Sequence, residues 1–181
     1  MIELAIKSKS SRKKDQYLNT ALNSADSLVQ IINDILDFSK IEAGKLSLEE
    51  IPLNIAEIVT EVYSLMAINA HNKGINLVIH IDKDLSNFVK GDPVRIKQIL
   101  FNLLNNAIKF TNEGNVTIYL KSEEFKNNKV KLYFSIKDTG IGIPRNKISK
   151  IFNKFDQASN STCRSFGGTG LGLSISRMLT K

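Results

Sequence analysis

The stretch Asn102-Leu-Leu-Asn-Asn106-Ala-Ile-Lys109-Phe110 decides how this chain is interpreted. Each residue of a helix advances by about 100°, so the three asparagines and the lysine, at i, i+3, i+4 and i+7, form one polar stripe. The opposite arc of the same helix is apolar and carries Ile96, Ile99, Leu100, Leu103, Ala107 and Ile108. The pattern predicts a helix that packs on a core through one face and directs its amides elsewhere.

The residue types of the polar stripe suit a phosphate-bound metal ion. An amide oxygen is a hard ligand for Mg²⁺, which keeps several waters and takes few protein ligands besides phosphate oxygens. A lysine one turn further on adds a point charge for phosphate. Taken alone, however, such a stripe is also typical of an ordinary solvated helix face, because polar side chains are mostly exposed.

Two glycine runs follow this helix along the chain, at Asp138-Thr-Gly140-Ile-Gly142 and at Gly167-Gly168-Thr-Gly170-Leu-Gly172-Leu. Glycine permits positive φ and lets the backbone approach a ligand closely. One Gly-x-Gly is weak evidence, because turns produce it constantly. Two such runs in series, each expected to follow a strand and precede a helix, favour a nucleotide pocket over a solvated helix face.

Four motifs of the second part resemble those of sensor histidine kinases: the N box at 99–111, the first glycine box at 138–142, the F box at 151–155 and the second glycine box at 168–173. Upstream, residues 24–28 and 31–45 resemble the second helix of that family's dimerisation and phosphoacceptor region, particularly in hybrid kinases. The resemblance spans nearly the whole chain. It implies the Bergerat (GHKL) ATP-binding sandwich, shared with gyrase, a heat-shock chaperone family and mismatch-repair ATPases.

The resemblance also implies ATP and Mg²⁺ as cofactors and assigns roles to single residues. It gives Asn106 to the metal, and Lys109 and Asn102 to the phosphates. It places Phe110 near the adenine and lets Asp138 accept a hydrogen bond from the adenine amino group. That last assignment has a physical sense, because a carboxylate only accepts and so favours the N6 donor of adenine over the O6 acceptor of guanine.

The other ATP-binding positions implied by the resemblance lie in the glycine runs and in a lid between them. Gly140 and Gly142 shape the base pocket. The lid and the start of the next helix cradle the phosphates, since helix N-terminal amides favour anions. These phosphate positions are Arg164, Gly168, Thr169, Gly170, Leu171 and Gly172.

One position separates the possible activities. ATP-hydrolysing relatives carry a glutamate as general base one turn before the metal asparagine, whereas this chain has Asn102. An amide cannot take a proton from water or a hydroxyl, but a neutral imidazole is itself nucleophilic. The expected function is therefore the catalytic part of a histidine kinase, which transfers the γ-phosphoryl group of ATP to a histidine. A GHKL-type ATPase and a degenerate, non-catalytic nucleotide-binding or dimerisation module stay open as alternatives.

Neither histidine of the chain lies in an acceptor motif. His71 is expected near a helix end and His80 within a strand, so the acceptor is expected upstream of Met1 and the isolated chain is predicted not to autophosphorylate. The chain ends at Lys181, where the family continues through two more strands. We therefore expect either an excerpt of a longer protein or a truncated gene product.

The first part, residues 1–46, is predicted to be a partial dimerisation region. Apolar residues recur at intervals of three and four from about Asp15 to Ala43, and Gly44 is a plausible C-cap. Such a helix exposes an apolar stripe to water unless it packs against another helix, so a homodimer is expected. A core helix of a monomeric domain is the alternative.

The second part, residues 47–181, is predicted to be the ATP-binding domain. After a linking segment with Pro52, the expected elements are a helix at 55–70, a strand at 76–82, the asparagine helix with Asp92 as N-cap and Pro93 at its first position, strands at 116–123 and 130–137 joined through Asn127 and Asn128, an irregular lid at 144–167 and a helix from Leu171. The fold class is α+β: a helical hairpin remnant, then an incomplete Bergerat α/β sandwich with a mixed sheet and helices on one face.

Charge and cysteine content indicate which kinds of partner and compartment to expect. The net charge is +7, but no recognition motif accompanies it, so nucleic acid is not expected. The single Cys163 fits a reducing compartment, and the location is expected to be cytoplasmic. The resemblance implies a response regulator receiver domain as partner. Whether a parent protein is anchored in a membrane is left open.

Overall fold

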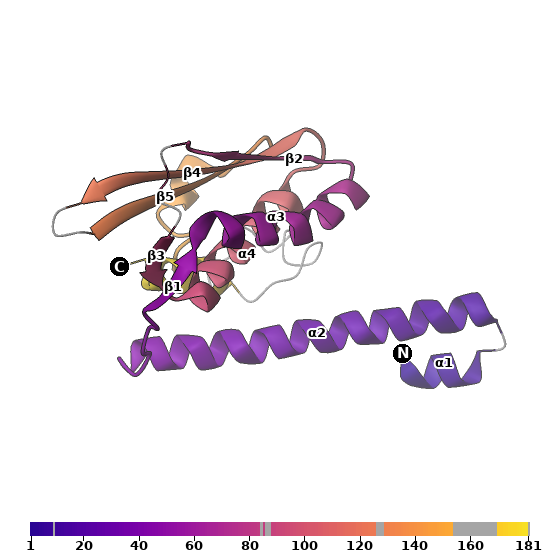
Figure 1. Ribbon diagram of the computed structural model, residues 1–181. Coiled ribbons are helices and arrows are strands. Elements are labelled where there is room, and N and C mark those ends of the chain that lie inside the picture. Colours follow the sequence, from indigo (N-terminus) through magenta and orange to yellow (C-terminus); the bar gives the residue numbers. More distant parts are fainter. Residues whose placement is uncertain (9, 84, 86–87, 126–128, 154–169, 181) are drawn as a thin grey trace. The chain divides into compact units, whose positions relative to one another are not determined.

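The computed structural model describes the chain except residues 9, 84, 86–87, 126–128, 154–169 and 181 (Figure 1). The chain divides into two compact units, Met1–Leu46 and Ser47–Lys181. This division coincides with the predicted boundary between residues 46 and 47. No helix among the described residues is long and apolar enough to cross a membrane.

The first unit is a helical hairpin of α1 (Ile2–Lys7) and α2 (Ser11–Glu42). α2 begins four residues before the predicted start at Asp15, so the polar residues 11–14, which we expected to form a loop, are its first turn. Its end is as predicted: Gly44 has φ +64. Lys45 N–H donates to Lys40 O at 2.9 Å and Gly44 N–H donates to Ile41 O at 3.0 Å. These two bonds form a Schellman motif, which requires a residue in the left-handed region.

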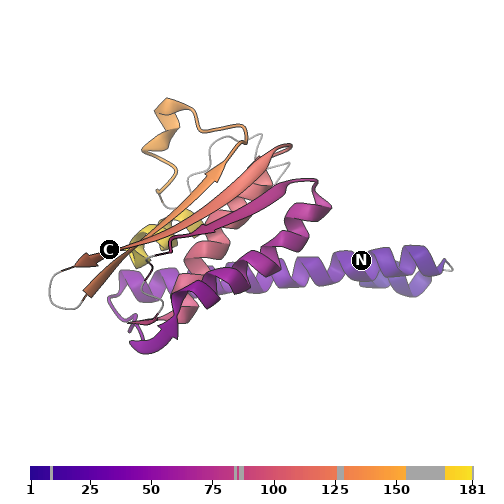
Figure 2. The same cartoon turned by 45° about the horizontal axis from the view of Figure 1, so that its top comes forward.

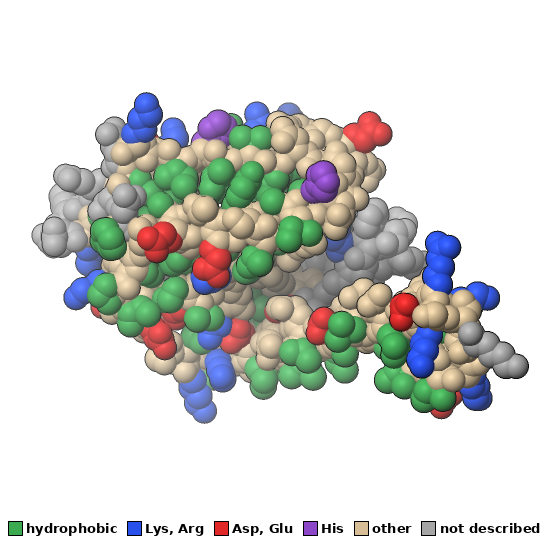
Figure 3. All heavy atoms as spheres, turned by 45° about the vertical axis from the view of Figure 1, so that its right-hand side comes forward, with side chains coloured by type: hydrophobic (Ala, Val, Ile, Leu, Met, Phe, Trp, Pro, Cys, Tyr) green, Lys and Arg blue, Asp and Glu red, His purple; other side chains and the backbone are tan. Residues whose placement is uncertain are grey.

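Large apolar side chains of α2 lie on the surface of this unit. The predicted pairing seam of this helix consists of Leu22, Ala25, Val29, Ile32 and Leu36, and its most exposed members are Leu22 at 60% and Val29 at 56%. Figure 3 shows apolar side chains at the surface of the molecule beside charged ones. The exposed members along the helix are Leu18, Leu22, Leu28, Val29, Ile31, Ile32, Ile35 and Leu36. An apolar stripe of this length favours pairing with another helix.

The second unit is built on a mixed three-stranded sheet in the order β2-β4-β5 (Figure 2). β2 (Asn76–Ile81) runs parallel to β4 (Asn115–Phe125), and β4 runs antiparallel to β5 (Lys129–Asp138). The mixed sheet confirms the prediction. The turn expected at Asn127 and Asn128 lies outside the described residues.

A second, two-stranded sheet was not predicted. β1 (Ile51–Asn54) pairs antiparallel with β3 (Phe88–Gly91), so the segment with Pro52 is a strand and not a linker. Proline removes one donor from the ladder, a loss that an edge strand tolerates. The buried Leu53 of β1 joins the core, which explains why this short segment becomes ordered.

Two helices, α3 (Ile55–Asn72) and α4 (Pro93–Phe110), cover one face of the three-stranded sheet (Figure 1). α4 turns Leu100, Leu104, Ala107 and Ile108 into the core. The apolar arc is therefore centred on Leu104, which is fully buried. Leu103, which was predicted to lie on this arc, is only half-buried, and Leu104, which was not, lies in the core.

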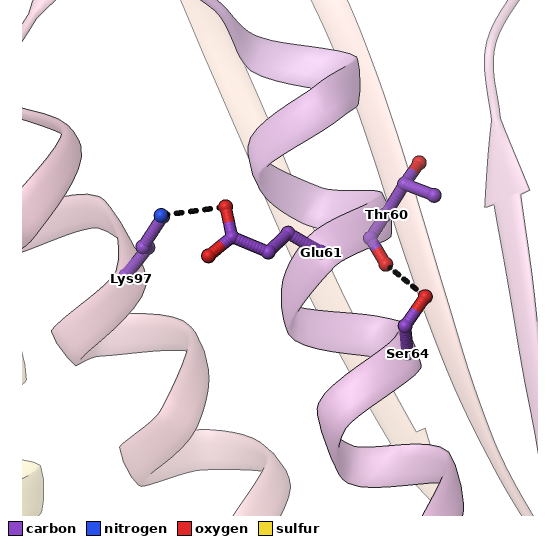
Figure 4. Close-up of polar contacts among 4 residues, drawn as sticks. All are labelled: Thr60, Glu61, Ser64 and Lys97. Atoms are coloured by element: carbon purple, nitrogen blue, oxygen red, sulfur yellow. Dashed lines mark hydrogen bonds and ion pairs between the residues drawn. The ribbon is translucent and has the colours of Figure 1, made fainter.

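Both helices begin with side-chain caps. Asn54 accepts from the amides of Ala56 and Glu57, and Asp92 accepts from those of Val94 and Arg95, with proline at the first position of α4. The predicted cap is thus confirmed. Lys97 of α4 lies 2.6 Å from Glu61 of α3 and joins the two helices near their starts (Figure 4).

The last described elements are α5 (Arg145–Ile148) and α7 (Gly172–Leu179). α5 lies in the segment predicted to be irregular, so part of that segment is helical. α7 begins one residue after the predicted start and packs on α4. Leu171, which precedes α7, and Ile175 within it are almost completely buried.

Candidate nucleotide site

The asparagine helix presents its polar stripe as predicted, but its members are not equivalent. Asn102, Asn106 and Lys109 are half-buried, whereas Asn105 is exposed. Asn106 lies one turn beyond Asn102 on the same side of α4. The Nζ atom of Lys109 lies 5.1 Å from the centre of the Phe110 ring. The final turn of α4 therefore gathers an amide, a cation and an aromatic ring.

The first glycine run returns to this final turn from the sheet. β5 ends at Asp138, whose Oδ1 atom accepts a hydrogen bond from Gly140 N–H at 2.9 Å. This bond orients the carboxylate. Ile141 N–H then donates to Phe110 O at 3.2 Å. Asp138 and Phe110, which the resemblance assigned to the adenine, are thus held in one neighbourhood by the backbone.

The glycine at position 140 is required by this backbone approach. A Cβ atom there would lie 2.4 Å from Phe110 O, a distance that real Cβ atoms essentially never show. Gly142 differs, because it has φ +67 and open space around its Cβ position. Gly140 is therefore needed for close packing against α4, whereas Gly142 is needed for its left-handed backbone conformation.

Asn102 connects α4 to the start of α7. Its Nδ2 atom donates to Gly172 O at 3.3 Å and to Ser176 Oγ at 3.4 Å. A Cβ atom on Gly172 would lie 3.2 Å from Asn102 Oδ1, which leaves little room for a side chain. A glutamate at position 102 would present only acceptor oxygens to the Gly172 carbonyl, so the amide suits this junction better than a carboxylate does.

The second glycine run is only partly described. Gly170 has φ +70, a value that favours glycine. The predicted phosphate residues Arg164, Gly168 and Thr169 lie outside the described residues. Gly170, Leu171 and Gly172 are described and lie at the start of α7, close to Asn102.

Sequence reasoning missed two residues at the end of α4. The buried Thr111 donates its hydroxyl to Ala107 O at 2.8 Å. The Nζ atom of Lys73 donates to Ile108 O at 2.6 Å and to Lys109 O at 2.7 Å. Lys73 lies 35 residues before Ile108, and no spacing rule connects residues of two separate helices.

The donor set fits Mg²⁺ held largely by phosphate oxygens and water. Among the described residues, no group of three or more His, Cys, Asp or Glu side chains could hold a metal. The half-buried Asn106 offers a single amide oxygen, and Lys109 follows it three residues later on the same helix. Few protein ligands and a nearby phosphate charge partner are what Mg²⁺ uses in nucleotide sites.

Neither histidine lies on the elements that carry the candidate site residues, which are α4 and the two glycine runs. His71 is exposed in the last turn of α3. His80 is exposed on β2, where its ring stacks on that of Tyr119 with 5.1 Å between centroids. His80 therefore has a packing partner on the outer face of the sheet.

Comparison with known proteins gives the family. Residues 91–181, which include the asparagine helix and both glycine runs, match the model of the histidine kinase-, DNA gyrase B- and HSP90-like ATPases. The chain belongs to this ATPase family. Residues 1–44 match the histidine kinase A (phospho-acceptor) domain. The two matches in series are those of a sensor histidine kinase.

Relatives of this kinase fragment agree with both matches. The signal transduction histidine-protein kinase BarA of Escherichia coli (strain K12) is 46% identical over 97% of this chain, which spans 19% of BarA. Hybrid signal transduction histidine kinase A of Dictyostelium discoideum is 37% identical over 98% of this chain and 8% of its own length. The chain is thus a fragment of the hybrid type and spans about a fifth or less of these relatives.

A solved structure shares the fold of both units. The crystal structure of full-length ShkA in complex with AMPPNP superposes with a TM-score of 0.74 at 30% identity. That match covers 98% of this chain and 35% of ShkA. The α+β arrangement of a helical hairpin followed by a mixed sheet with helices on one face is therefore that of its relatives.

Proposed function

We propose that this chain is the catalytic part of a two-component sensor histidine kinase, which binds Mg·ATP and transfers its γ-phosphoryl group to a histidine. The observation that carries the proposal is the junction at Phe110. There the hydrogen bond from Ile141 N–H joins the last turn of α4 to the turn after Asp138. The candidate metal, phosphate and base residues come from two distant segments and meet at this junction.

Each residue has a distinct task in the proposed site. Asn106 would hold Mg²⁺, and the ion, when bound, neutralises charge on the phosphates. Lys109 would move from the ring of Phe110 to a phosphate oxygen, since it keeps its positive charge in either position. Asp138 would accept from the adenine amino group through the carboxylate that Gly140 N–H orients. Arg164, Gly168, Thr169, Gly170, Leu171 and Gly172 would complete the phosphate side.

The geometry of Asn102 favours transfer to histidine over hydrolysis. Its amide donates to the start of α7, and an amide cannot act as a general base. Phosphoryl transfer depends mainly on positioning and charge neutralisation, and a neutral imidazole attacks without a base. An ATPase or a hydroxyl-directed kinase would need a proton acceptor at this place.

The acceptor is proposed to be a histidine other than His71 and His80. His71 lies at the exposed end of α3, and His80 is stacked on Tyr119. The match of residues 1–44 to a phospho-acceptor domain supports an acceptor on the hairpin of the first unit in the parent protein. The exposed apolar stripe of α2 supports a homodimer through this helix, and the hybrid type supports a receiver domain as the next partner. We also propose a cytoplasmic location for this part of the protein, because the proposed reaction uses ATP.

Calorimetric titration of the chain with Mg·ATP tests the nucleotide site. The unmodified chain should bind Mg·ATP, and Asn106→Ala should weaken binding only when Mg²⁺ is present, because it removes the metal ligand alone. Asn105→Ala is a matched control on the same helix, since Asn105 is exposed. Equal binding by all three proteins would refute the role of Asn106. No binding by the unmodified chain would refute the proposed function and would favour a non-catalytic dimerisation module.

A further inference from the structure

The last four carbonyl groups of α4, from Ala107 to Phe110, all have partners. The regular helical ladder ends with the bond from Thr111 N–H to Ala107 O, so the three oxygens after it have no intrahelical donor. Ala107 O accepts from Thr111 N–H at 3.1 Å and from the Thr111 hydroxyl. Phe110 O accepts from Ile141 N–H. The two carbonyls between them, of Ile108 and Lys109, accept from one ammonium group.

That ammonium group belongs to Lys73, which follows α3. Its backbone is fixed by a second Schellman motif, in which Gly74 N–H donates to His71 O and Ile75 N–H donates to Ala70 O, each at 2.9 Å. Gly74 has φ +75, and Ile75 is buried in the core. The backbone of Lys73 is therefore anchored, and its side chain reaches the end of the neighbouring helix from a fixed point.

We propose that Lys73 is a positioning residue of the nucleotide site, and this inference rests on the proposed function. Its Nζ atom lies 2.6 Å from Ile108 O and 2.7 Å from Lys109 O. These carbonyls belong to the turn that carries Asn106, Lys109 and Phe110. Lys73 holds this turn through two of its backbone carbonyl groups.

The physical reason is the charge of the helix end. Unpaired carbonyls give a helix C-terminus a partial negative charge, and a cation there is stabilising. An ammonium group has three donors, so one lysine satisfies two carbonyls. Lys73 therefore stabilises the turn through the carbonyl groups of Ile108 and Lys109.

Lys73 is exposed as a residue, so water can replace it at the two carbonyls. Its removal should therefore loosen the last turn of α4 without unfolding the unit. Lys97 offers a matched control, because it also joins α4 to α3, through Glu61 at 2.6 Å (Figure 4). It lies about three turns before Lys109, so its loss leaves the last turn untouched.

The experiment uses the whole chain as Lys73→Met, Lys73→Arg and Lys97→Met. Hydrogen exchange of the amides at 107–111 and 141 measures the order of the turn, and calorimetry measures affinity for Mg·ATP. Lys73→Met should speed exchange at these amides and weaken binding by about tenfold, the loss expected for a charge-assisted contact worth about 1.4 kcal/mol. Lys73→Arg should restore both, because a guanidinium also donates to two oxygens. Lys97→Met should change neither.

The two readouts separate the possible failures. Weaker binding by Lys73→Met with unchanged exchange would overturn the inference, since Lys73 would then act on the nucleotide itself. Equal effects of Lys73→Met and Lys97→Met would overturn it too, because any loss of positive charge would suffice. If the unmodified chain binds no nucleotide, the proposed function fails, and the exchange comparison alone decides whether Lys73 orders the turn.

Discussion

Replacing Gly140 by alanine tests how tightly the sheet is joined to the asparagine helix. The new Cβ atom would lie 2.4 Å from Phe110 O and 2.9 Å from the carbonyl carbon of Phe110. Both are backbone atoms, so the turn and the end of α4 must separate. Overpacking of this kind costs about 1–3 kcal/mol, and loss of the bond from Ile141 N–H to Phe110 O adds about 0.5–1.5 kcal/mol. The free energy of unfolding of the second unit should fall by about 1.5–4.5 kcal/mol.

Hydrogen exchange of the β4 and β5 amides is the assay, because these strands report the second unit by itself. Gly91→Ala is the matched control: its Cβ atom would lie 3.5 Å from Leu53 Cδ2 and 3.7 Å from Ile96 Cδ1, which are ordinary contacts. That change should alter stability by no more than about 0.5 kcal/mol. If Gly140→Ala were as mild as Gly91→Ala, the junction at Phe110 would be looser than the structure shows. Such a result would refute a site in which the first glycine run is joined to α4.

Three further outcomes are expected. Asp138→Asn should erode a preference for Mg·ATP over Mg·GTP in calorimetric titrations, since an amide adds donors that a carboxylate lacks; equal affinities in the unmodified chain would remove Asp138 from the base pocket. Ile32→Asp should weaken self-association measured by sedimentation, because burial of a large apolar side chain is worth about 1.5–3 kcal/mol; an unchanged monomer in both proteins would contradict a dimer through α2. Asn102→Glu should loosen α7, seen as faster exchange of its amides, because a carboxylate cannot donate to Gly172 O and Ser176 Oγ; unchanged exchange would show that α7 does not depend on this amide.

The parts of the fold that follow local rules were predictable from the sequence. Asp92 and Pro93 fixed the start of α4, and Gly44 fixed the end of α2, because caps depend on a few neighbouring residues. The three strands of the main sheet were also predicted, because apolar and polar residues alternate in Asn76–Ile81 and in the two segments on either side of residues 126–128. The predicted linker at Pro52 was wrong, because β1 owes its order to a distant partner, β3.

The residues of the candidate site could be proposed from the sequence, but their contacts could not. The stripe of asparagines and the glycine runs pointed to the same pocket, and their roles remain predictions. Three contacts join residues of separate elements: Gly140 packs against Phe110 O, Asn102 bonds to the start of α7, and Lys73 bonds to the end of α4. A single sequence gives no register between two helices, so these three contacts had no local signal.

Transfer of label from γ-labelled ATP to a phospho-acceptor hairpin tests the central claim most directly. The chain is incubated with a hairpin that carries the acceptor histidine, and the unmodified chain alone and Asn106→Ala serve as controls. Label should appear on the hairpin, should be lost in acid and retained in base, as expected for phosphorus on an imidazole nitrogen, and should be absent with Asn106→Ala. The chain alone should stay unlabelled. Label on His71 or His80, or acid-stable label on serine, would contradict the account.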